Sequence, residues 1–109
     1  MERVDMINYN KAVRDQIPEI IREQGRECTT KTLTDIDFLP YLEVKLEEEL
    51  QEYNESRSLI ELADLLEVIH RIIEIRGSSI DELEQLRIEK KNKRGGFKNN
   101  IVLLHVVNK

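Results

Sequence analysis

The apolar residues of this 109-residue chain recur mostly at helical spacing, and glycines or capping residues separate the periodic stretches. Pro18 lies near the start of the first stretch and Gly25 closes it, as is usual at the two ends of a helix. The pattern therefore predicts a mainly α-helical protein. Its helices are expected at about residues 17–24, 35–55, 59–76 and 79–93.

The predicted helix boundaries carry capping signals. Thr34 stands three residues before Asp37, so its hydroxyl can cap the second helix. Ser79 and Glu82 form a capping-box pattern for the fourth helix. Only a short link separates the second and third helices, so we expect them to pack antiparallel as a long hairpin. The first and fourth helices would flank this hairpin.

Two segments have the composition of β-strands. Residues 28–33 (CTTKTL) are rich in threonine, which predicts a strand or an extended connector. Residues 101–107 (IVLLHVV) are rich in β-branched side chains. We expect residues 101–107 to form a terminal strand that is able to pair with residues 28–33. No internal repeat, low-complexity tract or linker interrupts the chain, so residues 1–109 are interpreted as a single domain.

Acidic residues interrupt the apolar side of the second predicted helix. On a helical wheel, Glu49 falls inside the apolar stripe and Glu52 falls on its flank. A carboxylate on a core-facing stripe loses hydration, which is costly unless it is paired, protonated or bound to a metal. Glu49 therefore requires a partner.

The third predicted helix repeats this anomaly, with Glu61 inside its apolar arc and Asp64 at the border. Across an antiparallel hairpin, these two acids can face Glu49 and Glu52. Four facing carboxylates repel one another, and divalent cations are the natural compensation. Oxygen ligands favour Mg²⁺ or Mn²⁺ over zinc, and Mg²⁺ commonly shares its coordination shell with substrate phosphates. The pattern thus indicates phosphate chemistry.

A purely structural explanation of these acids is also open. With 22 acidic residues in the chain, carboxylates three residues apart arise by chance as well. Glu49 and Glu61 could instead form salt bridges with Lys45, with Arg71 or with another subunit.

The charge and the amino-acid composition of the chain argue against nucleic-acid-binding and membrane proteins. The net charge of −5 argues against a nucleic-acid partner. No stretch approaches the roughly 20 apolar residues of a membrane span, and the N-terminus lacks the apolar run of a secretory signal. Cys28 is the only cysteine and fits a reducing compartment. We therefore expect a cytoplasmic protein that does not bind a membrane.

The run KLEEELQE (Lys45 to Glu52), followed by ELAD (Glu61 to Asp64), resembles the signature of the MazG-like all-α nucleotide pyrophosphohydrolase superfamily, E-E-x-x-E followed by E-x-x-D. The runs YNKAVRDQIPEII (9–21) and EKKNKRGGF (89–97) look like flanking motifs of its phosphoribosyl-ATP pyrophosphohydrolase-like subgroup, so the resemblance covers nearly the whole chain. The short spacing between the two acidic motifs departs from many relatives and leaves base specificity open.

The resemblance implies a MazG-like helical bundle that hydrolyses a nucleoside triphosphate to the monophosphate and pyrophosphate, with Mg²⁺ as cofactor and Mn²⁺ as a substitute. Such an enzyme would act in cleaning the nucleotide pool. Glu48 or Glu52 would accept the proton of the attacking water. The implied metal ligands are Glu49, Glu52, Glu61 and Asp64, and the implied catalytic glutamates are Glu48, Glu49 and Glu52.

Basic residues near both ends of the chain are candidates for binding substrate phosphates. Lys11 and Arg14 are three residues apart, and Lys91 and Arg94 lie just before a double glycine. Arginine offers a planar fork that suits phosphate oxygens, and a Gly-Gly turn lets the backbone approach a ligand. Alternatively, the lysines form a solvated helix end that complements the helix dipole.

Two other functions compete with the pyrophosphohydrolase. Glu67 and His70 form a Glu-x-x-His motif that a two-fold dimer would duplicate, as in carboxylate-bridged di-iron proteins, but the motif lies on a predicted polar face. A non-enzymatic helical interaction module would use the apolar stripes to bind a partner. The broad apolar arc of the third helix predicts a homodimer or homotetramer in either case.

Overall fold

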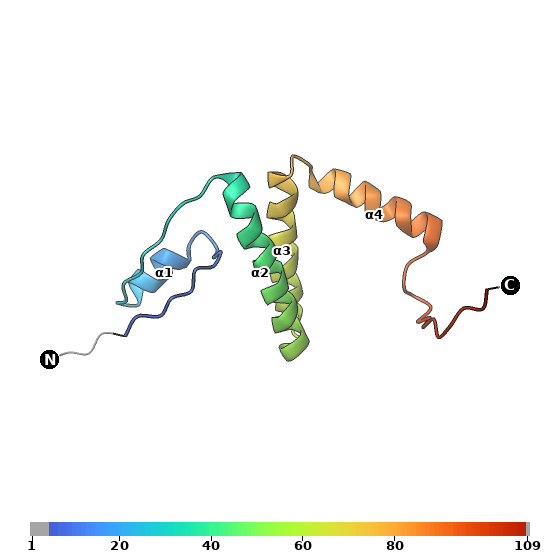
Figure 1. Cartoon of the computed structure of the whole chain (residues 1–109), viewed down its shortest axis with the longest axis horizontal. Coiled ribbons are helices and arrows are strands. Elements are labelled where there is room, and N and C mark those ends of the chain that lie inside the picture. The colour runs from blue at the N-terminus through green and yellow to red at the C-terminus, as the bar shows by residue number, and fades with distance from the viewer. Residues whose placement is uncertain (1–4, 109) are drawn as a thin grey trace. The chain divides into compact units, whose positions relative to one another are not determined.

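The computed structural model describes residues 5–108, and its regular structure in this range is helical (Figure 1). The helices are α1 (Ile17–Glu23), α2 (Asp35–Ser56), α3 (Leu59–Ile75) and α4 (Ile80–Arg94). The predicted mainly helical fold is confirmed. The chain divides into two compact units, Met1–Gly77 with α1 to α3 and Ser78–Lys109 with α4. None of the helices within residues 5–108 combines the length and apolar character needed to cross a membrane.

Helices α2 and α3 lie side by side and run antiparallel in the first unit (Figure 1). Arg57 begins the link between them with a left-handed backbone, at a φ of 57°, and its N–H donates to the carbonyl of Tyr53 at 2.8 Å. Ser58 then caps α3, because its hydroxyl accepts a hydrogen bond from the N–H of Ile60 at 3.3 Å. This tight turn reverses the chain and gives the expected helix hairpin.

Side-chain caps begin α2 and α4 where the sequence predicts them. The hydroxyl of Thr34 accepts from the N–H of Asp37 at 3.3 Å, and the hydroxyl of Ser79 accepts from the N–H of Glu82 at 3.1 Å. The Glu82 carboxylate in turn accepts from the hydroxyl of Ser78 at 2.6 Å. Caps of this kind each stabilise a helix by about 1 kcal/mol. Local chemistry therefore accounts for these helix starts.

The core of the described chain is small and lies mainly along the hairpin. Leu59 and Ile60, at the start of α3, remain 80% and 65% exposed. A hydrophobic core of this size stabilises a fold only weakly, because burial of apolar surface is the main favourable term in folding. The buried apolar residues among those described are Ala12, Leu42, Val68 and Ile73.

The predicted two-stranded element is wrong for the part of the chain that the structure describes. Residues 28–33 and residues 101–107 contain no strand. Threonine and β-branched side chains favour an extended backbone, but a strand also needs a neighbour that satisfies its N–H and C=O groups. The side chains of Ile101 and Leu104 are more than four-fifths exposed, at 83% and 84%. Amino-acid composition alone was therefore not sufficient to predict a strand in these segments.

Candidate metal centre

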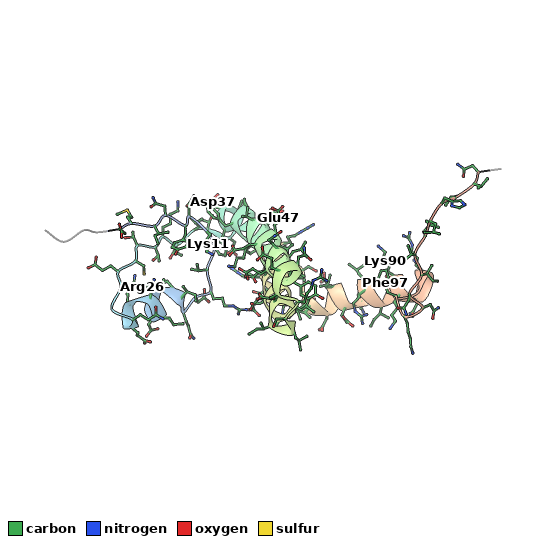
Figure 2. The ribbon with its side chains drawn as sticks, turned by 90° about the horizontal axis from the view of Figure 1, so that it is seen from below. Lys11, Arg26, Asp37, Glu47, Lys90 and Phe97 are labelled. Atoms are coloured by element: carbon green, nitrogen blue, oxygen red, sulfur yellow. The ribbon has the colours of Figure 1, made fainter. Side chains whose placement is uncertain are left out.

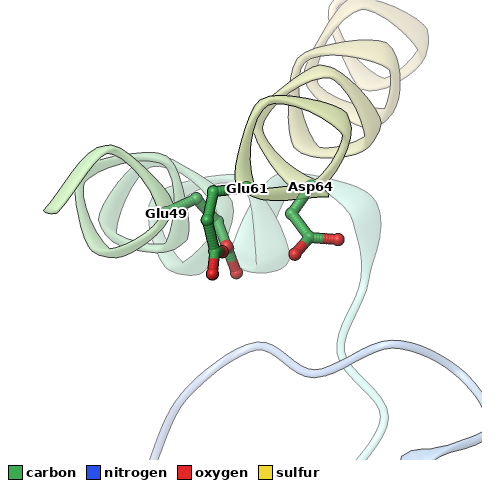
Figure 3. Close-up of side chains that lie close together, drawn as sticks. All are labelled: Glu49, Glu61 and Asp64. Atoms are coloured by element: carbon green, nitrogen blue, oxygen red, sulfur yellow. The ribbon is translucent and has the colours of Figure 1, made fainter. Parts of the chain in front are cut away.

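Three carboxylates from the two helices of the hairpin come together. Glu49 lies on α2, Glu61 and Asp64 lie on α3, and each offers a carboxylate oxygen within 4.8 Å of the others. Figure 3 shows the three carboxylates pointing to the same side of the helix pair. Carboxylates this close repel one another unless a cation or a proton compensates their charge. The cluster is therefore a candidate cation site.

The helix spacing and the tight turn together produce this cluster. Glu61 and Asp64 are three residues apart, so they occupy one face of α3. The turn at Arg57 and Ser58 lays α3 back along α2, which brings that face beside Glu49. The cluster is thus a direct consequence of the hairpin.

Glu49 is the buried member of the cluster, with 6% of its surface exposed. Its Oε1 lies 3.3 Å from Nζ of Lys45, whereas its Oε2 is buried with no hydrogen-bond partner among residues 5–108. Burial raises the pKa of the Glu49 carboxyl, Lys45 acts in the opposite direction, and the neighbouring Glu52 carboxyl raises it further. A buried charged oxygen without a partner is costly. A divalent cation at Oε2 would supply the missing interaction, so the residues present fit an oxygen-ligated metal.

Glu52 lies close to the cluster but outside it. Its side chain is half-buried one turn after Glu49 on α2, and none of its oxygens belongs to the group of three. Its carboxyl group interacts with the Glu49 carboxyl and electrostatically with Lys11. Of the four expected metal ligands, the structure therefore brings three together and leaves Glu52 beside them.

Two cations from the segment before α1 reach the acidic side of the hairpin. Nζ of Lys11 donates to Oε1 of Glu48 at 2.9 Å, and Figure 2 shows Lys11 beside α2. The guanidinium of Arg14 donates to Oδ1 of Asp64 at 2.7 Å. The hydrogen bond from Lys11 lowers the pKa of the Glu48 carboxyl, and Lys45, at 3.4 Å from the same oxygen, lowers it further. The candidate site therefore combines acidic ligands with a basic rim.

Comparisons with known proteins give no functional assignment. No family model matches this chain. No solved structure matches it. A stretch of 40 residues is 48% identical to an uncharacterized protein of Mycolicibacterium smegmatis, and it covers 37% of this chain and 41% of that relative. The description of that relative names no activity, so the geometry of the site carries the functional argument.

The other two predicted phosphate ligands belong to the second unit. Lys91 and Arg94 lie in the last turn of α4, and both are exposed. Gly95 ends the helix with a left-handed φ of 84°, and its N–H donates to the carbonyl of Lys91 at 2.7 Å. These residues therefore present positive charge at a helix end that precedes the double glycine.

A pocket beside the cluster was not predicted from the sequence. It has a volume of about 290 Å³ and lies between residues 10–12 and residues 40–48 of α2. The sequence contains one local indication of a chain turn at this pocket, which is Asn10. Its φ of 46° lies in the left-handed region, which asparagine tolerates better than most residues. Helical periodicity gives no information about Asn10, because it precedes the first periodic stretch.

Proposed function

We propose that this protein is a cytoplasmic, Mg²⁺-dependent nucleoside triphosphate pyrophosphohydrolase of the MazG-like type, which releases the monophosphate and pyrophosphate. The observation that carries the proposal is the unpartnered Oε2 of Glu49, buried within a group of three carboxylates. An orphaned buried oxygen in an acidic cluster is explained by a cation that the fold is built to receive. The resemblance of the acidic motifs to this superfamily supports the same function.

The number and type of ligands favour Mg²⁺ or Mn²⁺ over other metals. Glu49, Glu61 and Asp64 supply oxygen atoms, whereas zinc sites in proteins are built mostly from sulfur and imidazole. Ca²⁺ takes about six to eight oxygen ligands, which three carboxylates do not provide without many waters. Mg²⁺ usually uses a few carboxylates and completes its shell with waters and substrate phosphates. The cluster therefore suits an ion that binds together with a nucleotide.

The basic rim is suited to hold the phosphates. Arg14 contacts Asp64, a member of the acidic cluster. Lys11 contacts Glu48, which precedes the cluster residue Glu49 in the chain. A guanidinium can form two parallel hydrogen bonds with phosphate oxygens. In this proposal Arg14 exchanges its contact with Asp64 for the phosphates of the nucleotide. Lys11 keeps its hydrogen bond to Glu48 and donates a second one to a phosphate oxygen, because an ammonium group has three N–H donors. Both cations orient the leaving pyrophosphate.

The proton acceptor is better assigned to Glu52 than to Glu48. Oε1 of Glu48 accepts hydrogen bonds from both Lys11 and Lys45, and these contacts lower the pKa of its carboxyl group and hence its basicity. Glu52 is half-buried beside Glu49, and Lys11 donates its hydrogen bond to Glu48 and not to Glu52. Bound Mg²⁺ would lower the pKa of water and offset charge on the phosphate oxygens. Glu52 would then take up the proton that the water loses.

The proposal is tested by measuring pyrophosphate release from a panel of nucleoside triphosphates with and without Mg²⁺. Glu49→Gln and Asp64→Asn should each lower kcat by about 100-fold or more, because each removes a negatively charged ligand. Glu47→Gln is a matched control, since Glu47 is an exposed residue of the same helix outside the cluster. Release of orthophosphate alone, or full activity in both cluster variants, would refute the proposal.

Self-association is part of the same proposal. The first unit has few buried apolar side chains among its described residues, yet α3 exposes a run of large ones. An exposed apolar helix face of this kind is stabilised when another helix packs on it, and two copies of a hairpin can form a symmetric four-helix arrangement. We therefore propose a homodimer or homotetramer. The exposed α3 residues are Leu59, Ile60, Leu62 and Leu66.

A further inference from the structure

The pocket beside the acidic cluster has walls of two kinds. Ala12, Pro40 and Val44 give it apolar surface. The other lining residues carry polar or charged groups and are Asn10, Lys11, Tyr41, Lys45 and Glu48. Its volume of about 290 Å³ is close to the lower end of the roughly 300–1,000 Å³ that small-molecule sites occupy. The apolar part of its surface is larger than the polar part, which is typical of sites that hold a small organic molecule. The pocket is therefore large enough for a part of a ligand, not for a macromolecule.

The pocket is connected to the candidate metal centre through two residues. Lys45 and Glu48 both line the pocket. Nζ of Lys45 also lies 3.3 Å from Oε1 of Glu49, the buried member of the cluster, and Glu48 precedes Glu49 in the chain. One ligand can therefore place its phosphates at the carboxylate cluster and extend another part into the pocket.

The chemistry of the pocket favours the nucleobase over the phosphates as that part. Its two cations, Lys11 and Lys45, meet at one carboxylate oxygen of Glu48, at 2.9 and 3.4 Å, so the positive charge of the lining is concentrated there. Lys11 also lies over the ring of Tyr9, with its Nζ 5.5 Å from the ring centroid. Phosphate sites need cations or backbone N–H groups that are free to donate. Away from Lys11 and Lys45 the α2 wall offers neither, because helical N–H groups are bonded within the helix and Pro40 has none. We therefore assign the phosphates to the lysine end, next to the acidic cluster, and the nucleobase to the uncharged part of the pocket.

We propose that this pocket binds the nucleobase of the triphosphate substrate, an inference that rests on the proposed pyrophosphohydrolase function. The apolar walls contact the faces of the base. The side-chain amide of Asn10 carries both donors and an acceptor, so it is suited to read the polar edge of the base. Asn10 and Val44 are thereby assigned as residues that determine which base is accepted.

The experiment measures calorimetric dissociation constants in Mg²⁺ for two kinds of probe. One is a panel of non-hydrolysable α,β-methylene deoxynucleoside triphosphates, and the other is tripolyphosphate, which has no base. Val44→Trp fills the pocket, and Val44 is 61% exposed, so the change does not disturb the core. Ile36→Trp is the matched control, because Ile36 is an exposed α2 residue outside the pocket lining.

Val44→Trp should weaken binding of the tightest nucleotide analogue by about tenfold or more and change that of tripolyphosphate by less than about twofold. Asn10→Gly keeps the left-handed backbone and removes the amide, so it should reduce discrimination among the four bases. If Val44→Trp weakens the binding of both probes equally, the base assignment is overturned. It is also overturned if Val44→Trp weakens the binding of neither probe and Asn10→Gly keeps the wild-type preference among bases. Neither result contradicts the release of pyrophosphate. A wild-type protein that releases no pyrophosphate would overturn the proposed function itself.

Discussion

Arg14 and Asp64 are 50 positions apart in the chain, and the guanidinium of Arg14 donates to Oδ1 of Asp64 at 2.7 Å. This contact ties the segment before α1 to the acidic face of α3. It also holds an arginine, a side chain well suited to bind phosphate, against the candidate metal ligand Asp64. The pair therefore links the two halves of the proposed chemistry, cation binding and phosphate binding.

Arg14→Gln should affect catalysis far more than stability. The pair is partly exposed, with 56% and 30% of the two side chains accessible, so its loss should cost no more than about 1 kcal/mol of unfolding free energy. Removing a charged contact to the substrate phosphates should lower kcat/KM by about 10- to 100-fold. Steady-state kinetics and denaturant unfolding measure the two effects.

The matched control for Arg14 is Arg26→Gln. Arg26 belongs to the same unit and is exposed, and its guanidinium contacts Gln24 and not an acid of the cluster. This control should retain wild-type kinetics. Wild-type kcat/KM in Arg14→Gln, or an equal loss of activity in Arg26→Gln, would contradict the proposed role of Arg14.

Glu49→Gln should stabilise the metal-free protein while removing its response to metal. Burial raises the pKa of Glu49, which means that the ionised side chain opposes folding when no cation is present. A neutral amide should therefore raise the unfolding free energy in EDTA by about 1 kcal/mol. Addition of Mg²⁺ should raise the melting temperature of the wild type and leave that of Glu49→Gln unchanged. A less stable variant in EDTA would contradict this interpretation.

The ion pair between Lys11 and Glu48 should make stability fall in acid. Its hydrogen bond lowers the folded-state pKa of Glu48 below its ordinary value, so the contribution is present above the unfolded-state pKa and is lost as the pH falls through the folded-state pKa. Because both side chains are about one-third exposed, the contribution should not exceed about 1 kcal/mol. Urea unfolding of wild type and Lys11→Met should differ at pH 7, and the difference should disappear as the pH falls below the ordinary pKa of glutamate. A difference that grows in acid would contradict the assignment.

Self-association through α3 predicts a concentration-dependent assembly. Light scattering coupled to size exclusion should show a dimer or tetramer of the wild type, and Leu66→Asp should shift it toward the monomer, because Leu66 is a 51% exposed apolar residue of that face. Glu67→Ala changes the next, exposed and polar position and should leave the assembly intact. A monomeric wild type at high micromolar concentration would refute the proposed interface.

The parts of the fold that sequence predicted are those that local chemistry determines. The starts of α2 and α4 follow from the hydroxyls of Thr34 and Ser79, which bond to N–H groups three residues away. The burial of Glu49 follows from helical periodicity, because residues seven positions apart share one helix face and Leu42 is also buried. Such features depend on a few neighbouring residues only.

The parts that sequence could not give depend on contacts between distant segments. Residues 101–107 have strand propensity, but propensity does not supply a pairing partner, and the described chain forms no strand there. The position of the Glu52 carboxylate depends on side-chain torsions that an E-x-x-E spacing leaves free. The contact of Arg14 with Asp64 and the pocket at Asn10 depend on how the segment before α1 lies on the hairpin.

The central claim is that Glu49, Glu61 and Asp64 bind a divalent cation, and titration with Mn²⁺ followed by electron paramagnetic resonance tests it most directly. The free aqueous Mn²⁺ signal should decrease on addition of wild-type protein and of Glu47→Gln, and Mg²⁺ should restore it by competition. With Glu49→Gln, the free signal should remain at its full value. Undiminished free Mn²⁺ in the presence of wild-type protein, or equal binding by Glu49→Gln, would contradict the account.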